Sequence, residues 1–142
     1  MAEIKSLSAF LKENAESLNA FEIVISERFK DETGAPIPWQ IKIPNGGEVA
    51  RLKRKFQKRI YKQGTPELHI DDEGLLSEAL EQLVIYPSLK DEALQNSYGA
   101  MSASELAEKM LNAGEYDKLS RAILYAMGND MNISDEVHEI KN

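Results

Sequence analysis

Few residues in this sequence have the types and spacing that catalysis or metal binding requires. The chain has no cysteine, which removes thiol nucleophiles, iron–sulfur ligation and cysteine-based zinc sites together. Its two histidines, His69 and His138, lie far apart in the sequence, so neither a His-rich metal site nor a Ser-His-Asp triad is expected. The run Asp71-Asp72-Glu73 offers ligands for a hard cation, but three consecutive carboxylates at a helix start do not converge on one point. Helix capping explains these acids better.

A phosphate site is the next candidate, because Gly46-Gly47 precedes a basic segment. The Gly-x4-Gly-Lys-Ser/Thr pattern of a phosphate-binding loop is missing, however. No stretch combines a nucleophile, a base and an oxyanion donor. We therefore predict a protein that is not an enzyme, with no catalytic, cofactor-binding or metal site, and that works by binding.

Charge is distributed unevenly along the chain. Residues 48–62 carry seven basic and one acidic side chain, a net +6, although the whole chain has a net charge of −7. Such a basic stripe can steer a partner, or it can be solvated or balanced by the acidic remainder of the protein. Both interpretations stay open from the sequence. The candidate partner-binding residues of this stripe are Arg51, Arg54, Lys55, Lys58 and Arg59.

The composition fits one domain. A chain of 142 residues with 42% hydrophobic side chains can form a core without disulfides. It has no apolar run of the roughly 18–20 residues that span a bilayer, and its start does not resemble a secretory signal. We expect a cytoplasmic protein with no membrane contact.

The elements that must position the candidate residues follow from hydrophobic periodicity. Helical spacing over 7–15 predicts an N-terminal helix, and alternation over 21–43 predicts an antiparallel hairpin with a loop longer than two residues. A basic helix is expected over 48–62, helices over 71–128, and a flexible acidic tail over 129–142. The predicted fold class is α+β: a mainly α-helical single domain (1–128) whose hairpin packs against about five to six helices.

Aromatic residues divide into expected core and possible surface. Phe21, Trp39 and Phe56 fall on the apolar faces of predicted elements and are assigned to the core. Three tyrosines are further partner-binding candidates, with half-buried packing as the alternative: Tyr86, Tyr98 and Tyr116.

Four blocks of the sequence, in order along the chain, resemble one known family. They are Ser26–Asp31 with Gly34 and Pro38–Lys42; Val84–Asp91; Leu94–Gly99; and Ser104–Leu106 with Lys109–Leu111 and Gly114–Tyr116. These blocks are similar to the XkdN-like tail assembly chaperones of contractile-tailed phages and PBSX-like prophages. The resemblance covers roughly residues 5–128, and the sequence departs from the family pattern mainly between Gln63 and Asp72 and after Gly128.

The resemblance implies a non-enzymatic role in tail assembly. Such proteins keep the long tape-measure protein soluble and bring it together with tail-tube subunits in the cytoplasm of the bacterial host, and they are not expected in the mature virion. In related phages a programmed frameshift adds a domain, and this chain would be the short product or a protein without that extension.

Two other functions compete with this one. A nucleic-acid-associated adaptor acting through 48–62 would be retained on DNA or heparin in a salt-sensitive way, although the acidic net charge argues against it. A structural tail component would be found in purified particles, where a chaperone would be missing.

Overall fold

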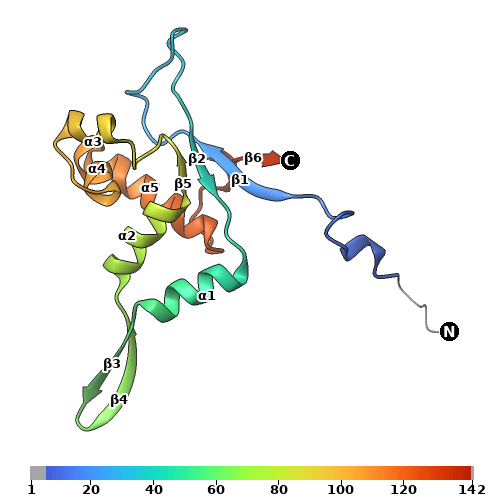
Figure 1. Ribbon diagram of the computed structural model, residues 1–142, viewed down its shortest axis with the longest axis vertical. Helices are drawn as coiled ribbons and strands as arrows, with labels where there is room; N and C mark the ends of the chain where they lie inside the picture. Colours follow the sequence, from blue (N-terminus) through green and yellow to red (C-terminus); the bar gives the residue numbers. More distant parts are fainter. Residues whose placement is uncertain (1–5, 142) are drawn as a thin grey trace.

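A four-stranded antiparallel sheet organises the body of the protein (Figure 1). The computed structural model describes residues 6–141. The sheet has the strand order β5-β2-β1-β6. Its strands are β1 (Leu18–Ile23), β2 (Trp39–Lys42), β5 (Val84–Tyr86) and β6 (His138–Lys141).

The predicted N-terminal hairpin is confirmed as the pair β1–β2. Phe21 lies opposite Ile41 and Ile23 opposite Trp39, and all four side chains are buried. Directly opposed residues share a face of an antiparallel pair, so this register puts one apolar face toward the core. A long connection over 24–38 joins the two strands, as the sequence predicted.

Helices cover this apolar face of the sheet. Leu80, Leu106, Leu119 and Ile123 are fully buried with the sheet residues in a single core cluster. The ring of Phe21 meets that of Tyr125 edge-on, with centroids 5.6 Å apart. The helices are α1 (Gly46–Lys55), α2 (Asp72–Leu83), α3 (Glu92–Tyr98), α4 (Ala103–Met110) and α5 (Ala113–Ala126).

The expectation of a mainly helical fold is wrong in its proportions. A second, two-stranded sheet is formed by β3 (Gln57–Lys62) and β4 (Thr65–Ile70), which gives six strands beside five α-helices in the part of the chain described. The sequence predicts that the basic helix continues to residue 62, but α1 ends at Lys55. The fold is therefore mixed α+β.

The predicted helix over 7–15 is also wrong. Residues 6–17 are exposed and form no α-helix. They contain the 3-10 turn η1 (Ser8–Phe10) and a second turn closed on the Leu11 carbonyl oxygen, and the segment lies away from the body (Figure 1). Leu7 and Phe10 are 75% and 80% exposed. A helix this short needs a packing surface to persist, and this segment has none in the structure.

Residues 129–141 do not form a loose tail, contrary to the expected flexible tail over 129–142. Ile133 is 1% exposed and belongs to the core cluster, and the turn η2 (Ser134–Glu136) leads into β6. β6 pairs antiparallel with β1, placing Glu139 opposite Phe21. The edge of β1 that does not pair with β2 offers its backbone N–H and C=O groups to β6, and this pairing orders the segment. The sequence of the segment alone does not reveal this pairing, because β1 lies far away along the chain.

Candidate partner-binding surface

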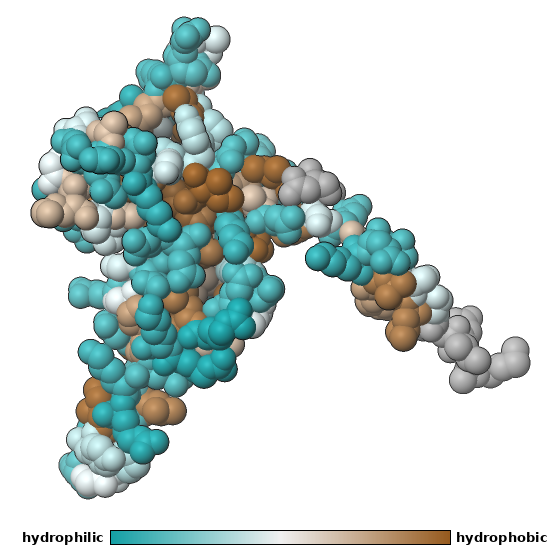
Figure 2. Space-filling model, in the orientation of Figure 1, coloured by the Kyte–Doolittle hydropathy of each residue, from teal (hydrophilic) through white to brown (hydrophobic). Residues whose placement is uncertain are grey.

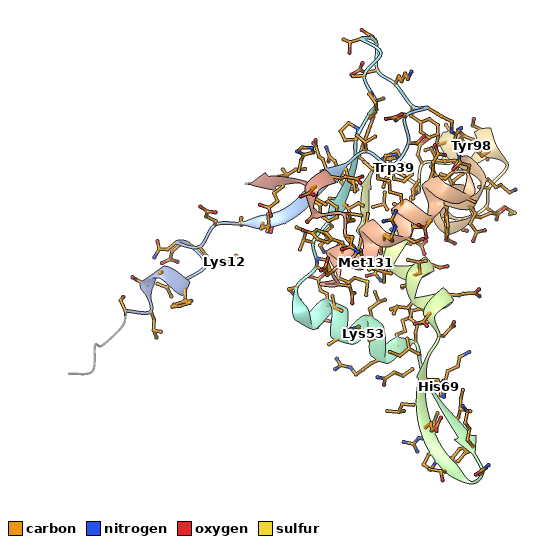
Figure 3. All side chains as sticks on the ribbon, turned by 180° about the vertical axis from the view of Figure 1, so that it is seen from behind. Lys12, Trp39, Lys53, His69, Tyr98 and Met131 are labelled. Atoms are coloured by element: carbon orange, nitrogen blue, oxygen red, sulfur yellow. The ribbon has the colours of Figure 1, made fainter. Side chains whose placement is uncertain are left out.

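The helix α1 begins at a well-formed cap. Asn45 is its N-cap, and the Asn45 side chain accepts a hydrogen bond of 2.9 Å from the Glu48 backbone N–H. Leu52 is the buried residue of this helix, so its other sides face solvent. Its basic side chains extend outward, as the labelled Lys53 illustrates (Figure 3).

The chain then turns into a hairpin, β3–β4, that projects from the body (Figure 1). Gln63 and Gly64, with φ of 51° and 80°, form its two-residue turn. Positive φ at both positions is the hairpin geometry that matches strand twist, and glycine adopts it without strain. All six residues of β3 are exposed.

The register of this hairpin separates two faces. Arg59 lies opposite Leu68, Tyr61 opposite Pro66, and Gln57 opposite Ile70. We call the exposed side chains Tyr61, Pro66, Leu68 and Ile70 the apolar row. The opposite face carries Lys58, Ile60, Lys62, Glu67 and His69. Figure 2 shows hydrophobic surface on this hairpin bordered by hydrophilic side chains.

The root of the hairpin is fixed to α2. The Asp71 backbone N–H donates a 2.8 Å hydrogen bond to the Phe56 carbonyl oxygen, and the Asp71 side chain caps α2 by accepting from Gly74. Lys55 Nζ lies 2.8 Å from Glu78 Oε1 on that helix. This bond from Lys55 lowers the pKa of the Glu78 carboxyl group. α1, the hairpin and α2 are therefore held together at one point.

The basic side chains of this region are only partly neutralised within the chain. Lys55 pairs with Glu78, and Lys62 Nζ lies 3.8 Å from Glu67 Oε2. Across residues 6–141, Arg54, Lys58 and Arg59 have no ion-pair partner. The surface keeps a positive charge that an acidic partner can meet.

The structure brings five of the eight candidate residues into this region. Arg51, Arg54 and Lys55 lie on α1, and Lys58 and Arg59 follow on β3. The two on β3 belong to different faces of the hairpin, because their positions differ by one residue.

The three tyrosines lie elsewhere. Tyr86, on β5, is half exposed and lines an apolar pocket of about 120 Å³ with Trp39 and Leu94. Tyr98 and Tyr116 are partly buried against the core. Burial raises the pKa of the Tyr116 hydroxyl, and Glu108 and Glu73 add to the shift. Tyr98 and Tyr116 thus pack as half-buried residues, which the sequence analysis gave as the alternative to partner binding.

A charged cluster that sequence reasoning missed joins the β1–β2 connection to α5. Arg28 Nη2 lies 2.6 Å from Glu115 Oε1 and donates a 2.8 Å bond to the Met110 carbonyl. The Ser26 hydroxyl donates to Glu115 as well. The bond from Arg28 is the main cause that lowers the pKa of Glu115 to about 2. Both carboxylate oxygens of Glu115 already accept hydrogen bonds from Arg28, so this side chain is suited to a structural role.

Glu115 has a second structural role at the start of α5. It accepts a 3.0 Å bond from the Asn112 backbone N–H while the Asn112 side chain accepts from the Glu115 N–H. The spacing Asn-x-x-Glu of these two residues is typical of a capping box, and it is the sequence signal that indicates this contact.

Residues 6–141 contain no group of three or more His, Asp or Glu side chains placed to hold a metal ion. None of the helices in that range is sufficiently long and apolar to span a membrane. The fold and surface define a small α+β protein that displays a basic hairpin with one apolar face.

The sequence matches the model of the phage XkdN-like tail assembly chaperone family over residues 7–141. The chain therefore belongs to this family, and the resemblance seen in the sequence is confirmed. Tail assembly chaperones have a non-enzymatic kind of role, and their partners are tail proteins in general.

One relative shares both sequence and fold with the chain. This chain is 22% identical to that relative, the uncharacterized protein YqbN of Bacillus subtilis (strain 168), over 143 residues, which cover 99% of this chain and 95% of the relative. The crystal structure of the protein YqbN matches with a TM-score of 0.71 and 21% identity, covering 90% of this chain and 100% of that one. This likeness shows a shared fold.

Proposed function

We propose that this protein binds the tape-measure protein and brings it together with tail-tube subunits during tail assembly in the host cytoplasm. It acts without catalysis and leaves before the particle is complete. The family membership supports tail proteins as the partners. The observation that carries the proposal is the exposed apolar row on the β3–β4 hairpin, which no other part of residues 6–141 covers.

Physical reasoning connects that surface to the proposed client. A long helical protein with apolar faces aggregates unless another surface covers them. A small body with a net charge of −7 adds repulsion that keeps such a complex dispersed. The protein thus combines a surface for attachment with a charge that opposes aggregation.

Co-expression with the tape-measure protein of the same phage genome tests the proposal. The expected result is a higher soluble yield of the tape-measure protein and its co-purification with this chain, compared with expression alone. An unchanged yield without co-purification would contradict the proposal. Mass spectrometry of purified particles should find the tape-measure protein but not this chain, and its stable presence would favour a structural component.

A further inference from the structure

The apolar row of the β3–β4 hairpin lacks the cover that a two-stranded sheet needs. Tyr61 and Leu68 are 65% and 68% exposed, and Ile70 at the root is 40% exposed. An isolated pair of strands is at best marginally stable in water, and packing of one face against another element stabilises it. The row is thus the face on which an added element would pack.

The charges around the row define the chemistry of that element. Residues 46–70 carry seven basic and two acidic side chains, a net +5, whereas the remainder of the chain has ten basic and twenty-two acidic side chains, a net −12. Arg59 lies on the same face as the row, whereas Lys58 and Lys62 lie on the opposite face of the hairpin. An occupant with acidic residues beside its apolar contacts can pair with Arg59, which has no ion-pair partner among the described residues, and its charge is complementary to the net positive charge of this region.

The spacing of the row suits a helix. Alternate residues of β4 are about 6.6–6.8 Å apart along the strand, so the contacts from Pro66 to Ile70 extend over about 13 Å. Two turns of an α-helix cover about 11 Å and present apolar side chains on one side. An added strand fits less well, because Pro66 has no N–H to donate along the β4 edge.

We propose that the apolar row binds an amphipathic α-helix of a partner protein, with acidic residues flanking the apolar stripe of that helix. This inference rests on the proposed function and names the chemistry of the client segment. A second copy of this chain is the lesser candidate. The apolar faces of its helices α2, α4 and α5 are buried in its own core, and a direct hairpin-to-hairpin contact would bring two basic surfaces together. Its exposed apolar side chains Leu7 and Phe10 lie in the segment 6–17, which forms no α-helix.

Two synthetic helical peptides of about 18 residues provide the test, with the full chain as receptor. Both carry the same leucine stripe at helical spacing, flanked by glutamate in one peptide and by lysine in the other. Fluorescence anisotropy should detect binding of the glutamate peptide that weakens with rising salt, and much weaker binding of the lysine peptide. Equal binding of both peptides, or binding of neither, would overturn the inference.

Matched variants locate the contact. Leu68→Ser removes a member of the row, and Ile60→Ser makes a similar change on the opposite face of the same hairpin. We expect Leu68→Ser to weaken binding of the glutamate peptide about tenfold or more and Ile60→Ser to change it less than about twofold. Tyr61→Ser repeats the test within the row, and circular dichroism checks that each variant folds. Equal effects on the two faces would overturn the inference.

The remaining outcomes separate this inference from the proposed function. Self-association of the chain that Leu68→Ser abolishes, measured by sedimentation, would assign the row to a second copy and overturn the inference. If the wild-type chain and Leu68→Ser solubilise the tape-measure protein equally well, the function stands and the inference fails. If peptide binding follows the prediction but the wild-type chain does not act on the tape-measure protein, the inferred surface stands and the proposed function fails.

Discussion

Arg28 and Glu115 are separated by 86 intervening residues and meet in an ion pair of 2.6 Å. The pair ties the connection after β1 to the first turn of α5, and the same carboxylate closes the capping box of that helix. One side chain thus stabilises a local helix start and a long-range contact together. Its loss should affect both.

Replacement of Glu115 should destabilise the fold in a pH-dependent way. Because the pKa of Glu115 is lowered from 4.5 to about 2 in the folded state, its contribution is present above pH 4.5 and is lost as the pH falls toward 2. We expect Glu115→Gln to lower the free energy of unfolding by on the order of 1 kcal/mol at neutral pH. Urea unfolding at neutral pH and near pH 2 measures the difference between wild type and variant, which should shrink at the lower pH. A difference that is constant with pH would contradict the assignment.

The C-terminal segment should contribute to global stability. Ile133 is fully buried, so Ile133→Ala should lower the free energy of unfolding by about 2–4 kcal/mol through lost burial and a cavity. Met101→Ala is the control, because Met101 is 88% exposed and its loss should cost less than about 0.5 kcal/mol. Chemical denaturation measures both. Similar values for the two variants would mean that residues after Gly128 do not belong to the cooperative unit.

Elements with strong local patterns could be predicted from the sequence. The alternation around Phe21 and Ile41 gave the β1–β2 hairpin, and its register confirms the buried face. Asp71 caps α2 as expected, and Ser102 caps α4 from a position three residues before Glu105, the spacing of a capping box. In each case the signal lies within one short window of sequence, where capping and periodicity act directly.

The extent of the basic helix could not be predicted because its pattern is ambiguous. Leu52, Phe56 and Ile60 follow helical spacing, and this favoured one helix through residue 62. The turn at Gln63-Gly64 and the β-favouring residues beside it instead support strand pairing with Thr65–Ile70. The partner strand decides between the two structures, and a window confined to 48–62 does not contain it.

The candidate site was only partly predictable for the same reason. The five basic candidates all fall within residues 51–59, so their shared region follows from the sequence, whereas Tyr86, Tyr98 and Tyr116 lie on β5, α3 and α5. The apolar row depends on the pairing of β3 with β4, which sets which side chains share a face. The order in the segment after Gly128 likewise depends on the distant edge of β1.

Charge reversal on the basic surface should leave the fold intact and reduce partner binding. Arg54 and Lys58 have no ion-pair partner among the described residues, and the Lys55 side chain in its pair with Glu78 is 60% exposed. We therefore expect the triple variant Arg54→Glu, Lys55→Glu, Lys58→Glu to lose little stability, since exposed pairs contribute at most about 1 kcal/mol. Thermal unfolding and co-purification with the tape-measure protein measure the two effects.

A second triple variant controls for net charge alone. Lys12, Lys30 and Lys90 are exposed lysines outside the basic surface, and their replacement by glutamate makes a comparable change in total charge. This control should retain co-purification. If the first triple variant unfolds, the basic side chains have a structural role. If both variants lose co-purification equally, the change in net charge causes the loss of binding, and the basic surface is not the contact.

Gly74 should be required for the hairpin to keep its position. A Cβ atom at Gly74 would lie 2.7 Å from Cε1 of Phe56, at the hairpin root, and 2.6 Å from Oδ2 of the capping residue Asp71. Alanine in a helix gains about 1 kcal/mol over glycine in propensity, but displacement of the ring costs about 1–3 kcal/mol and loss of the cap about 1 kcal/mol more. We expect Gly74→Ala to be destabilised by on the order of 1 kcal/mol and to bind the tape-measure protein less well.

Gly46→Ala is the control, because its new Cβ has open space around it. It should be neutral or slightly stabilised in the same denaturation measurement and should co-purify as the wild type does. Equal behaviour of the two variants would show that Phe56 moves aside freely and that its contact with α2 does not hold the hairpin.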